Sequence, residues 1–314
     1  YFYGVAGLMI YNMGAGILRA VGDSRRPLYF LIFSAVVNTV LDLVFVINFG
    51  WGIAGVAIAT VVAQCLSAVL VLIVLTRSSG SYKIDWRRVR INGRMLRTIC
   101  KIGLPPALQQ AVTSFSNVFV QAYINQFGKA CMAGWTAYSK IDQFALLPSQ
   151  SIALSTTTFV GQNLGAENLR RAKAGTNRAL GLALAATLVL IAPLVLFPEQ
   201  LIYIFNKDPE VLWYGVFFMR VISPFYLMVA VNQIYFGALS GAGDTVWPTS
   251  IMLCSFVVVR QIYLYATSML VGTVLPVALG YPVGWVMCST ALFLYYRSGR
   301  WENRRVVIKQ KAQA

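Results

Sequence analysis

Histidine is absent from this sequence, and acidic residues are few: ten Asp and Glu stand against 26 Lys and Arg in 314 residues. Histidine is the commonest general base in enzymes and the commonest metal ligand. No Asp-Asp-x-x-Asp motif is present to supply clustered carboxylates instead. Membrane-embedded prenyl or acyl transferases need such groups, so we expect that the protein is not an enzyme.

Charge of either sign is also scarce. Charged residues make up 11% of the chain, whereas an ordinary soluble domain carries about 25%. Apolar residues make up 58%, which leaves too little polar surface to cover a soluble core and is too much for a disordered chain. The composition therefore excludes a soluble globular enzyme and indicates a membrane protein.

Closely spaced cysteines are missing as well. The five cysteines lie at least 31 residues apart, and no Cys-x-x-Cys pair occurs. This spacing argues against a disulfide framework and against a metal site. We predict small, buried, apolar side chains at these positions, which are Cys65, Cys100, Cys131, Cys254 and Cys288.

What the chain does have is a series of long apolar runs. A helix that crosses a bilayer needs about 20 mostly apolar residues. Nine stretches meet this criterion, and they predict an all-α polytopic membrane protein. They lie near residues 1–18, 28–49, 52–76, 100–127, 132–158, 179–197, 213–238, 247–271 and 274–296.

Basic residues concentrate in every second connection between these runs. Twenty-one of the 26 Lys and Arg follow the first, third, fifth and ninth runs, and the net charge is +16. This is the pattern of the positive-inside rule, which predicts a cytoplasmic C-terminus. Because the membrane explains the basic residues, we expect no nucleic-acid partner. The segment 167–178 is predicted to be an amphipathic helix on the cytoplasmic surface.

A turn motif occurs twice, at residues 16–27 and 237–248. The copies share Gly, Leu, Gly, Asp and Pro, with Ser24 aligned to Thr245. Glycine permits unusual dihedral angles, Asp caps the next helix and Pro fits its first turn. A helix-to-helix turn needs these residues anyway, but two copies in one topological position favour duplication.

The spacing of the copies predicts further helices. Residues 103–105 (Gly-Leu-Pro), which we expect to open a helix, precede Gly243 by 140 residues, but only 21 residues precede Gly22. We therefore expect that about three spans are absent upstream. The complete protein would then have twelve spans in two halves with the same orientation.

With these features the sequence resembles the multidrug and toxic compound extrusion (MATE) transporters, in particular their prokaryotic members. The resemblance is carried by the two turns, by residues 103–105, by residues 38–42 (Asn-Thr-Val-Leu-Asp) and by residues 159–166 (Phe-Val-Gly-Gln-Asn-Leu-Gly-Ala). It implies the two-lobe, twelve-helix fold of that family, of which this chain holds the fourth to twelfth helices. The implied parts are the second half of the N-lobe (1–76), a basic cytoplasmic loop (77–101), the C-lobe (102–296) and a basic cytoplasmic tail (297–314).

Asp42 is the most informative single residue, because a carboxylate inside an apolar span is costly and indicates function. Asn38 lies one turn earlier on the same helix face. Asp42 and Thr60 each lie eight residues from the Gly50–Gly52 turn, so both lie about 12 Å from it. These three oxygen-bearing side chains suit a hard cation such as Na⁺, or a proton on the carboxylate.

The resemblance implies further site residues. It places Asn38, Asp42 and Thr60 in an N-lobe coupling-cation site, with Asn12 on the adjoining helix and another carboxylate on the family's first helix. Its C-lobe implies a substrate cavity, for which the polar residues inside spans are candidates. These are Gln109, Asp142, Asn232, Gln233 and Arg260. Asp142 is a candidate for a polar cavity, and Arg260 is equally consistent with substrate binding, with pairing to a carboxylate and with snorkelling.

From this resemblance we expect an antiporter that exports organic, mostly cationic or amphipathic compounds in exchange for Na⁺ or H⁺. We expect no other cofactor, a location in the plasma membrane and a monomer when the chain is complete. Two alternatives stay open. One is a lipid-linked oligosaccharide flippase of a related fold, and the other is an inactive fragment of a disrupted transporter gene, which would not carry out coupled transport alone.

Overall fold

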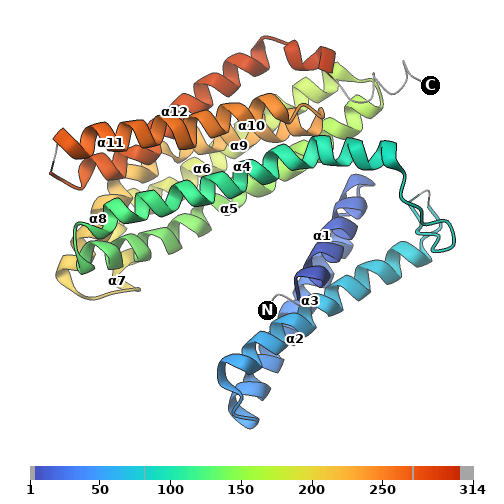
Figure 1. Ribbon diagram of the computed structural model, residues 1–314, viewed down its shortest axis with the longest axis horizontal. Coiled ribbons are helices and arrows are strands. Elements are labelled where there is room, and N and C mark those ends of the chain that lie inside the picture. Colours follow the sequence, from blue (N-terminus) through green and yellow to red (C-terminus); the bar gives the residue numbers. More distant parts are fainter. Residues whose placement is uncertain (1–3, 81, 271, 305–314) are drawn as a thin grey trace. The chain divides into compact units, whose positions relative to one another are not determined.

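Helices account for all regular secondary structure in residues 4–80, 82–270 and 272–304, which are the residues that the structure, a computed structural model, describes (Figure 1). The predicted all-α fold is confirmed. The pattern of contacts between residues divides the chain into a first unit (1–92) and a second unit (93–314). Most of the predicted basic tail, from residue 305 onward, lies outside the described residues.

The first unit is a three-helix arrangement. Small residues let α1 approach α3 closely: a Cβ added to Gly7 would lie 3.1 Å from the backbone nitrogen of Cys65. The Tyr11 hydroxyl donates to the Pro27 carbonyl at 2.9 Å, which ties α1 to the start of α2. The elements are α1 (Val5–Ala20), α2 (Arg25–Leu43), a π-helical turn (Val44–Asn48) and α3 (Gly52–Arg77).

The second unit contains the remaining helices of the described chain, packed around several clusters of buried apolar residues. Its centre is α5, which packs against α6, α8 and α9. The α-helices are α4 (Gly93–Asn125), α5 (Lys129–Gly165), α6 (Leu169–Leu196), α7 (Pro198–Tyr203), α8 (Pro209–Ile222), α9 (Tyr226–Gly241), α10 (Val246–Leu253), α11 (Arg260–Leu270) and α12 (Leu275–Arg297). A 3₁₀ turn (Ser223–Phe225) joins α8 to α9, and a π-helical turn (Cys254–Val259) joins α10 to α11.

The two copies of the turn motif share a backbone conformation but differ in their partners. Gly22 and Gly243 have φ of +90° and +81°, the region that favours glycine. Asp23 caps α2 as predicted, accepting from the Arg26 backbone N–H at 3.2 Å. Asp244 is buried and accepts a hydrogen bond from the Tyr295 hydroxyl of α12. The shared motif therefore fixes the turn, and the surrounding helices decide what its Asp contacts.

The start of α4 differs from the prediction. Residues 103–105 were expected to open a helix, but α4 begins at Gly93 and continues through Pro105 and Pro106. A proline inside a helix leaves the carbonyl four residues earlier without its donor. Here the Thr245 hydroxyl donates to the Lys101 carbonyl at 3.5 Å, so the second turn motif compensates for Pro105. The connection between α3 and α4 is thus shorter than the predicted loop 77–101.

Six helical segments of the described chain are long and apolar enough to cross a membrane, so this is a multi-pass membrane protein. Sequence analysis predicted nine spans, and the other three correspond to α1, α4 and α5. The α1 helix has only 16 residues, whereas α4 and α5 are long but rich in Ser, Thr, Asn and Gln. These polar side chains lower the mean hydropathy of α4 and α5 below that of an apolar span. The predicted surface helix 167–178 is instead the first part of α6.

The prediction of buried cysteines holds for two of the five. Cys131 and Cys288 are buried, but Cys65, Cys100 and Cys254 are exposed. The exposed ones lie on helix faces that have no neighbour packed over them, which an apolar run does not reveal. All five are free thiols.

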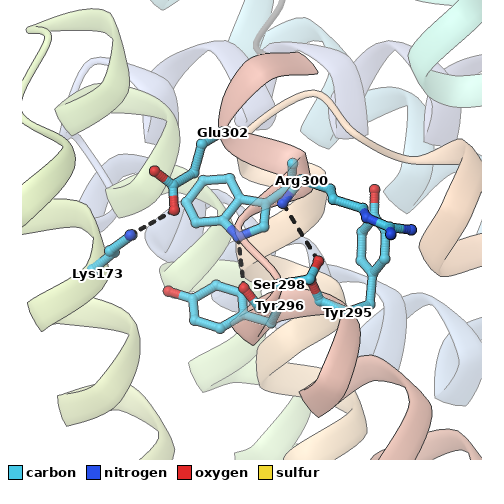
Figure 2. A network of polar contacts seen from close by, with 7 residues as sticks. Lys173, Tyr295, Tyr296, Ser298, Arg300 and Glu302 are labelled. Atoms are coloured by element: carbon cyan, nitrogen blue, oxygen red, sulfur yellow. Dashed lines mark hydrogen bonds and ion pairs between the residues drawn. The ribbon is translucent and has the colours of Figure 1, made fainter.

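The residues after α12 fold back on the second unit as a short 3₁₀ helix (Arg300–Arg304). Trp301 is 1% exposed, and its indole N–H donates to the Tyr296 carbonyl at 3.0 Å. Glu302 forms an ion pair with Lys173 of α6 (Figure 2). The end of α12 is therefore attached to α6.

Candidate functional site

The middle of α2 carries two polar side chains, each with one shielded polar atom that forms no hydrogen bond. Asn38 and Asp42 are both half-buried and lie one turn apart. The Asn38 amide nitrogen and the Asp42 Oδ1 are shielded from solvent and have no hydrogen-bond partner. An unsatisfied buried polar atom is rare and calls for a specific explanation, such as an ion that binds there.

Thr60 and Asn12 lie on the two other helices of this unit. Thr60 is half-buried on α3, and its hydroxyl donates to the Val56 carbonyl at 2.9 Å. Its proton is used in that bond, but its oxygen lone pairs stay available for a cation. Asn12 is exposed on α1. The structure thus brings Asn38 and Asp42 onto one helix face, and the binding of a cation by these four residues stays a prediction.

A π-helical turn follows Asp42 almost directly, at Val44–Asn48. Single turns of π-helix are uncommon and often occur at functional sites, because the wider turn redirects the side chains around it. A second π-helical turn, Cys254–Val259, comes directly before Arg260. Asp42 and Arg260, which lie deep in their spans, are therefore each next to a local change from α-helix to π-helix.

The second unit contains a chain of hydroxyl groups ending on a carboxylate. The Tyr138 hydroxyl donates to Asp142 Oδ1 at 3.2 Å, both residues lying on α5. The hydroxyl of Tyr226, on α9, lies 3.1 Å from that of Tyr138. Either of the two hydroxyls can be the donor in that contact.

Arg260 of α11 is held by neutral groups of α4. Its Nη2 donates to Ser116 Oγ at 2.8 Å and to Asn117 Oδ1 at 2.9 Å. The side chain is only 4% exposed, and its guanidinium carbon lies 5.1 Å from the centre of the Tyr281 ring. Its Nε has no hydrogen-bond partner. In the described residues no Asp or Glu forms an ion pair with Arg260, which argues against the carboxylate-pairing interpretation. The burial of its guanidinium inside the unit argues against snorkelling to the membrane surface.

A cavity of about 260 Å³ connects these two groups of residues. Asp142 lies in its wall together with Asn117 and Tyr281, which are both contacts of Arg260. Aromatic rings form much of the rest: Trp135, Tyr138 and Trp285. The cavity therefore combines a carboxylate, a nearby guanidinium and aromatic faces.

The other predicted cavity residues lie elsewhere. Gln109 is 6% exposed and donates to Thr113 Oγ1 of its own helix at 3.1 Å. Asn232 is 2% exposed and donates to the carbonyl of Trp285 at 3.4 Å, which places it behind the cavity wall. Gln233 is half-buried on α9. The structure thus places Asp142 in the lining of the cavity and Arg260 behind it, in contact with Asn117 and Tyr281 of the lining, and leaves the other three outside the lining.

Sequence reasoning did not identify which aromatic residues line the cavity. Tyr138 lies at i−4 from Asp142 and could have been found from helical spacing. Tyr226, Tyr281 and Trp285 come from other helices, and nothing local in the sequence distinguishes them from the chain's many other aromatic residues. Their role depends on how α5, α9 and α12 pack.

The acidic residues do not group in the way that a multi-carboxylate metal site requires. Among the residues described, no three Asp, Glu, Cys or His side chains come close enough to hold one metal ion. A cation at Asp42 would therefore take neutral amide and hydroxyl oxygens from this chain as its other ligands.

Several helices that are long and apolar enough to span a bilayer define a polytopic membrane protein. A profile of the MatE family matches residues 105–266, about half of the chain. The chain belongs to the MatE family.

Three relatives illustrate the similarity. A probable multidrug resistance protein of Bacillus subtilis is 30% identical over 310 residues, which are 97% of this chain and 68% of that protein. The probable multidrug resistance protein NorM of Thermotoga maritima is 25% identical, over 99% of this chain and 68% of its own. An FAD transporter of Shewanella oneidensis is 29% identical over 258 residues, which are 80% of this chain and 56% of that protein.

Solved structures of the same fold agree. A MATE structure in a bent conformation superposes with a TM-score of 0.87 at 22% identity, over 98% of this chain and 68% of that one. A transporter from Pyrococcus furiosus superposes with a TM-score of 0.86 at 23% identity, over 93% of this chain and 67% of that one. At this identity the likeness shows the fold.

Proposed function

We propose that the protein exports small organic compounds, mostly cationic or amphipathic, across the plasma membrane in exchange for Na⁺ or H⁺. The names of the similar multidrug resistance proteins support export, and a half-buried carboxylate inside a span supports coupling to a cation. The observation that carries the proposal is the unused Oδ1 of Asp42, shielded within an apolar helix beside Asn38. A partly buried carboxylate in that environment gains most from a bound cation or proton.

Coupling follows from the two states of this carboxylate. Ionised Asp42 is costly in an apolar span, and Na⁺ or a proton removes that cost. Asn38 and Thr60 would supply further oxygens, and Asn12 of α1 would adjoin them. A cation shifts a conformational equilibrium only through its different affinity for the two arrangements of the transporter. A proton-linked or sodium-linked change at Asp42 would therefore favour one arrangement and release the exported compound.

The cavity of the second unit suits an organic cation. Its carboxylate, Asp142, attracts positive charge, and the aromatic rings of Trp135 and Trp285 in the lining add to this through their quadrupoles. Aromatic walls also accept flat compounds of different shape, because stacking needs no matched hydrogen bonds. We assign Asp142 to recognition of the compound and Asp42 to coupling.

Replacing Asp42 by Asn tests the coupling assignment. In cells that express the complete gene, D42N should lower ion-driven efflux of a cationic dye at least about tenfold, because it removes the charge that binds the cation. D85N is the matched control: Asp85 is exposed, pairs with Arg88 in the connection after α3, and its loss should leave efflux unchanged. Both variants must be present in the membrane at wild-type amounts. Wild-type efflux by D42N would refute the assignment.

Arg260 favours a second candidate, export of a compound that carries a carboxylate or phosphate. A guanidinium 4% exposed with an unpaired Nε has capacity for an anion, and one relative is named as an FAD transporter. Cells expressing the gene would then release flavin nucleotide, and R260Q would abolish that release while dye efflux continues. Loss of dye efflux alone would favour the first candidate.

A further inference from the structure

A groove of about 680 Å³ runs between α5 and α6, apart from the polar cavity described above. Ile152, Ser155 and Phe159 of α5 form one wall. Arg171, Arg178 and Leu182 of α6 form the other. Neither the transport proposal nor the family match assigns any role to it.

The two arginines form a positively charged end. They lie seven residues apart, which is two helical turns, or about 10 Å along one face of α6. Both side chains are exposed, and neither takes part in an ion pair within the described ranges of the chain. Lys173 of the same helix turns to Glu302 instead (Figure 2). Two guanidinium groups therefore line one groove without an acidic partner among the described residues, and the carbon of the Arg171 group lies 5.9 Å from the centre of the Phe159 ring.

The remainder of the groove is apolar in character. The Ser155 hydroxyl donates to the Ser151 carbonyl of its own helix at 3.0 Å, so its proton is not offered to the groove. Leu182 is 61% exposed there. The α6 helix is long and apolar enough to cross a membrane, and the groove follows its first four turns. A ligand that fills the groove must be apolar along its length and anionic at one end.

We propose that this groove binds an anionic phospholipid. Its phosphate lies between Arg171 and Arg178, and an acyl chain runs past Phe159 towards Leu182. Guanidinium groups recognise phosphate through paired, charge-assisted hydrogen bonds. Basic residues gather at this end of α6, and clusters of this kind attract the anionic lipids of the cytoplasmic leaflet. The proposal does not depend on the direction or substrate of transport.

The test uses the protein produced from the complete gene and purified in detergent. Native mass spectrometry counts the lipid retained after equilibration with phosphatidylglycerol or with phosphatidylcholine of the same acyl chains. Wild type should retain phosphatidylglycerol in preference. Since each basic side chain near an anionic lipid contributes about 1 kcal/mol, R171Q/R178Q should bind phosphatidylglycerol about 30-fold more weakly.

Three further measurements distinguish binding in the groove from general attraction to basic residues and from binding of a free anion. R170Q/K173Q removes two charges from the same end of α6 outside the groove lining and should weaken retention much less than R171Q/R178Q does. A174W fills the groove while keeping both arginines and should lose it. Inorganic phosphate alone should neither bind detectably nor displace the lipid. Melting in lipid-free detergent verifies that each variant is folded.

The proposal is overturned if R171Q/R178Q retains phosphatidylglycerol like wild type, or if phosphatidylcholine is retained equally. Retention by A174W would place the lipid elsewhere. Displacement by inorganic phosphate would mean that the arginines form a site for a free anion rather than for a lipid.

Discussion

Ionisable residues inside the spans of this protein are stabilised by neutral partners. Asp142 accepts from Tyr138, and Arg260 donates to Ser116 and Asn117, so neither relies on an opposite charge. Neutral hydrogen bonds reduce the cost of burying a charge but leave it able to attract a ligand. Asp42 differs from both, since its shielded Oδ1 has no hydrogen-bond partner.

Removing the Tyr138 hydroxyl should destabilise the second unit. Y138F loses the buried bonds to Asp142 and to Tyr226, which costs about 2 kcal/mol. Y226F loses one of these bonds and should cost about 1 kcal/mol. Y138F/Y226F should be less stable than Y138F by at most a few tenths of a kcal/mol, because both changes remove the same bond. Denaturation in detergent measures all three.

The matched control is Y203F, since Tyr203 is 50% exposed and its ring, not its hydroxyl, faces Lys207. It should change stability by less than about 0.5 kcal/mol. If Y138F were as stable as Y203F, the hydroxyl chain would contribute nothing to the fold.

At the scale of helices, glycine sets the closest contacts. A Cβ on Gly241 of α9 would lie 2.4 Å from the Thr157 carbonyl oxygen of α5, and one on Gly237 would lie 2.6 Å from that of Ala153. Small residues at such positions let two helix backbones approach, which is a usual feature of packing in membranes. This contact holds α9, and with it Tyr226, against α5.

Adding a methyl group here should separate the helices. G241A forces backbone atoms apart and should lower the free energy of unfolding by about 1–3 kcal/mol. G181A is the control, because no atom lies within 4 Å of the added Cβ on α6. There the better helix propensity of alanine should raise stability by about 0.5–1 kcal/mol. A loss of stability in G241A together with a gain in G181A, measured by thermal unfolding, would support the contact. Equal effects of the two variants would contradict it.

On the scale of the whole molecule, charge distribution predicts orientation in the membrane. The basic connection between α3 and α4 should be cytoplasmic, and the connection between α7 and α8 should lie outside. Exposed Ser79 and Lys207 represent these two connections.

Labelling of single cysteines checks this orientation. In a variant without the five native cysteines, K207C should react with a membrane-impermeant maleimide in intact cells. S79C should react only after the membrane is opened, because Lys and Arg keep its connection on the cytoplasmic side. Labelling of S79C from outside would reverse the proposed orientation and the cytoplasmic C-terminus with it.

Local features of the fold were predictable from the sequence. The apolar runs indicated the helices, and the positive φ of Gly22 and Gly243 follows from the repeated turn. Asp42, Asp142 and Arg260 were identified because charge inside an apolar run is costly wherever the helix packs. The helical start of α4 before Pro105 was not predictable, because its compensating donor, Thr245, is 144 residues away.

Composition, charge and periodicity by themselves therefore determined a multi-pass helical membrane protein and its deep ionisable residues. Only the tertiary structure decided which groups meet: Tyr226 with Tyr138, Arg260 with Ser116, and Trp285 with the Asp142 cavity. The physical reason is that helix formation and insertion depend on neighbouring residues, whereas side-chain partners across the second unit depend on how closely whole helices approach. Those approaches are set by small residues such as Gly237 and Gly241, whose effect the sequence does not show.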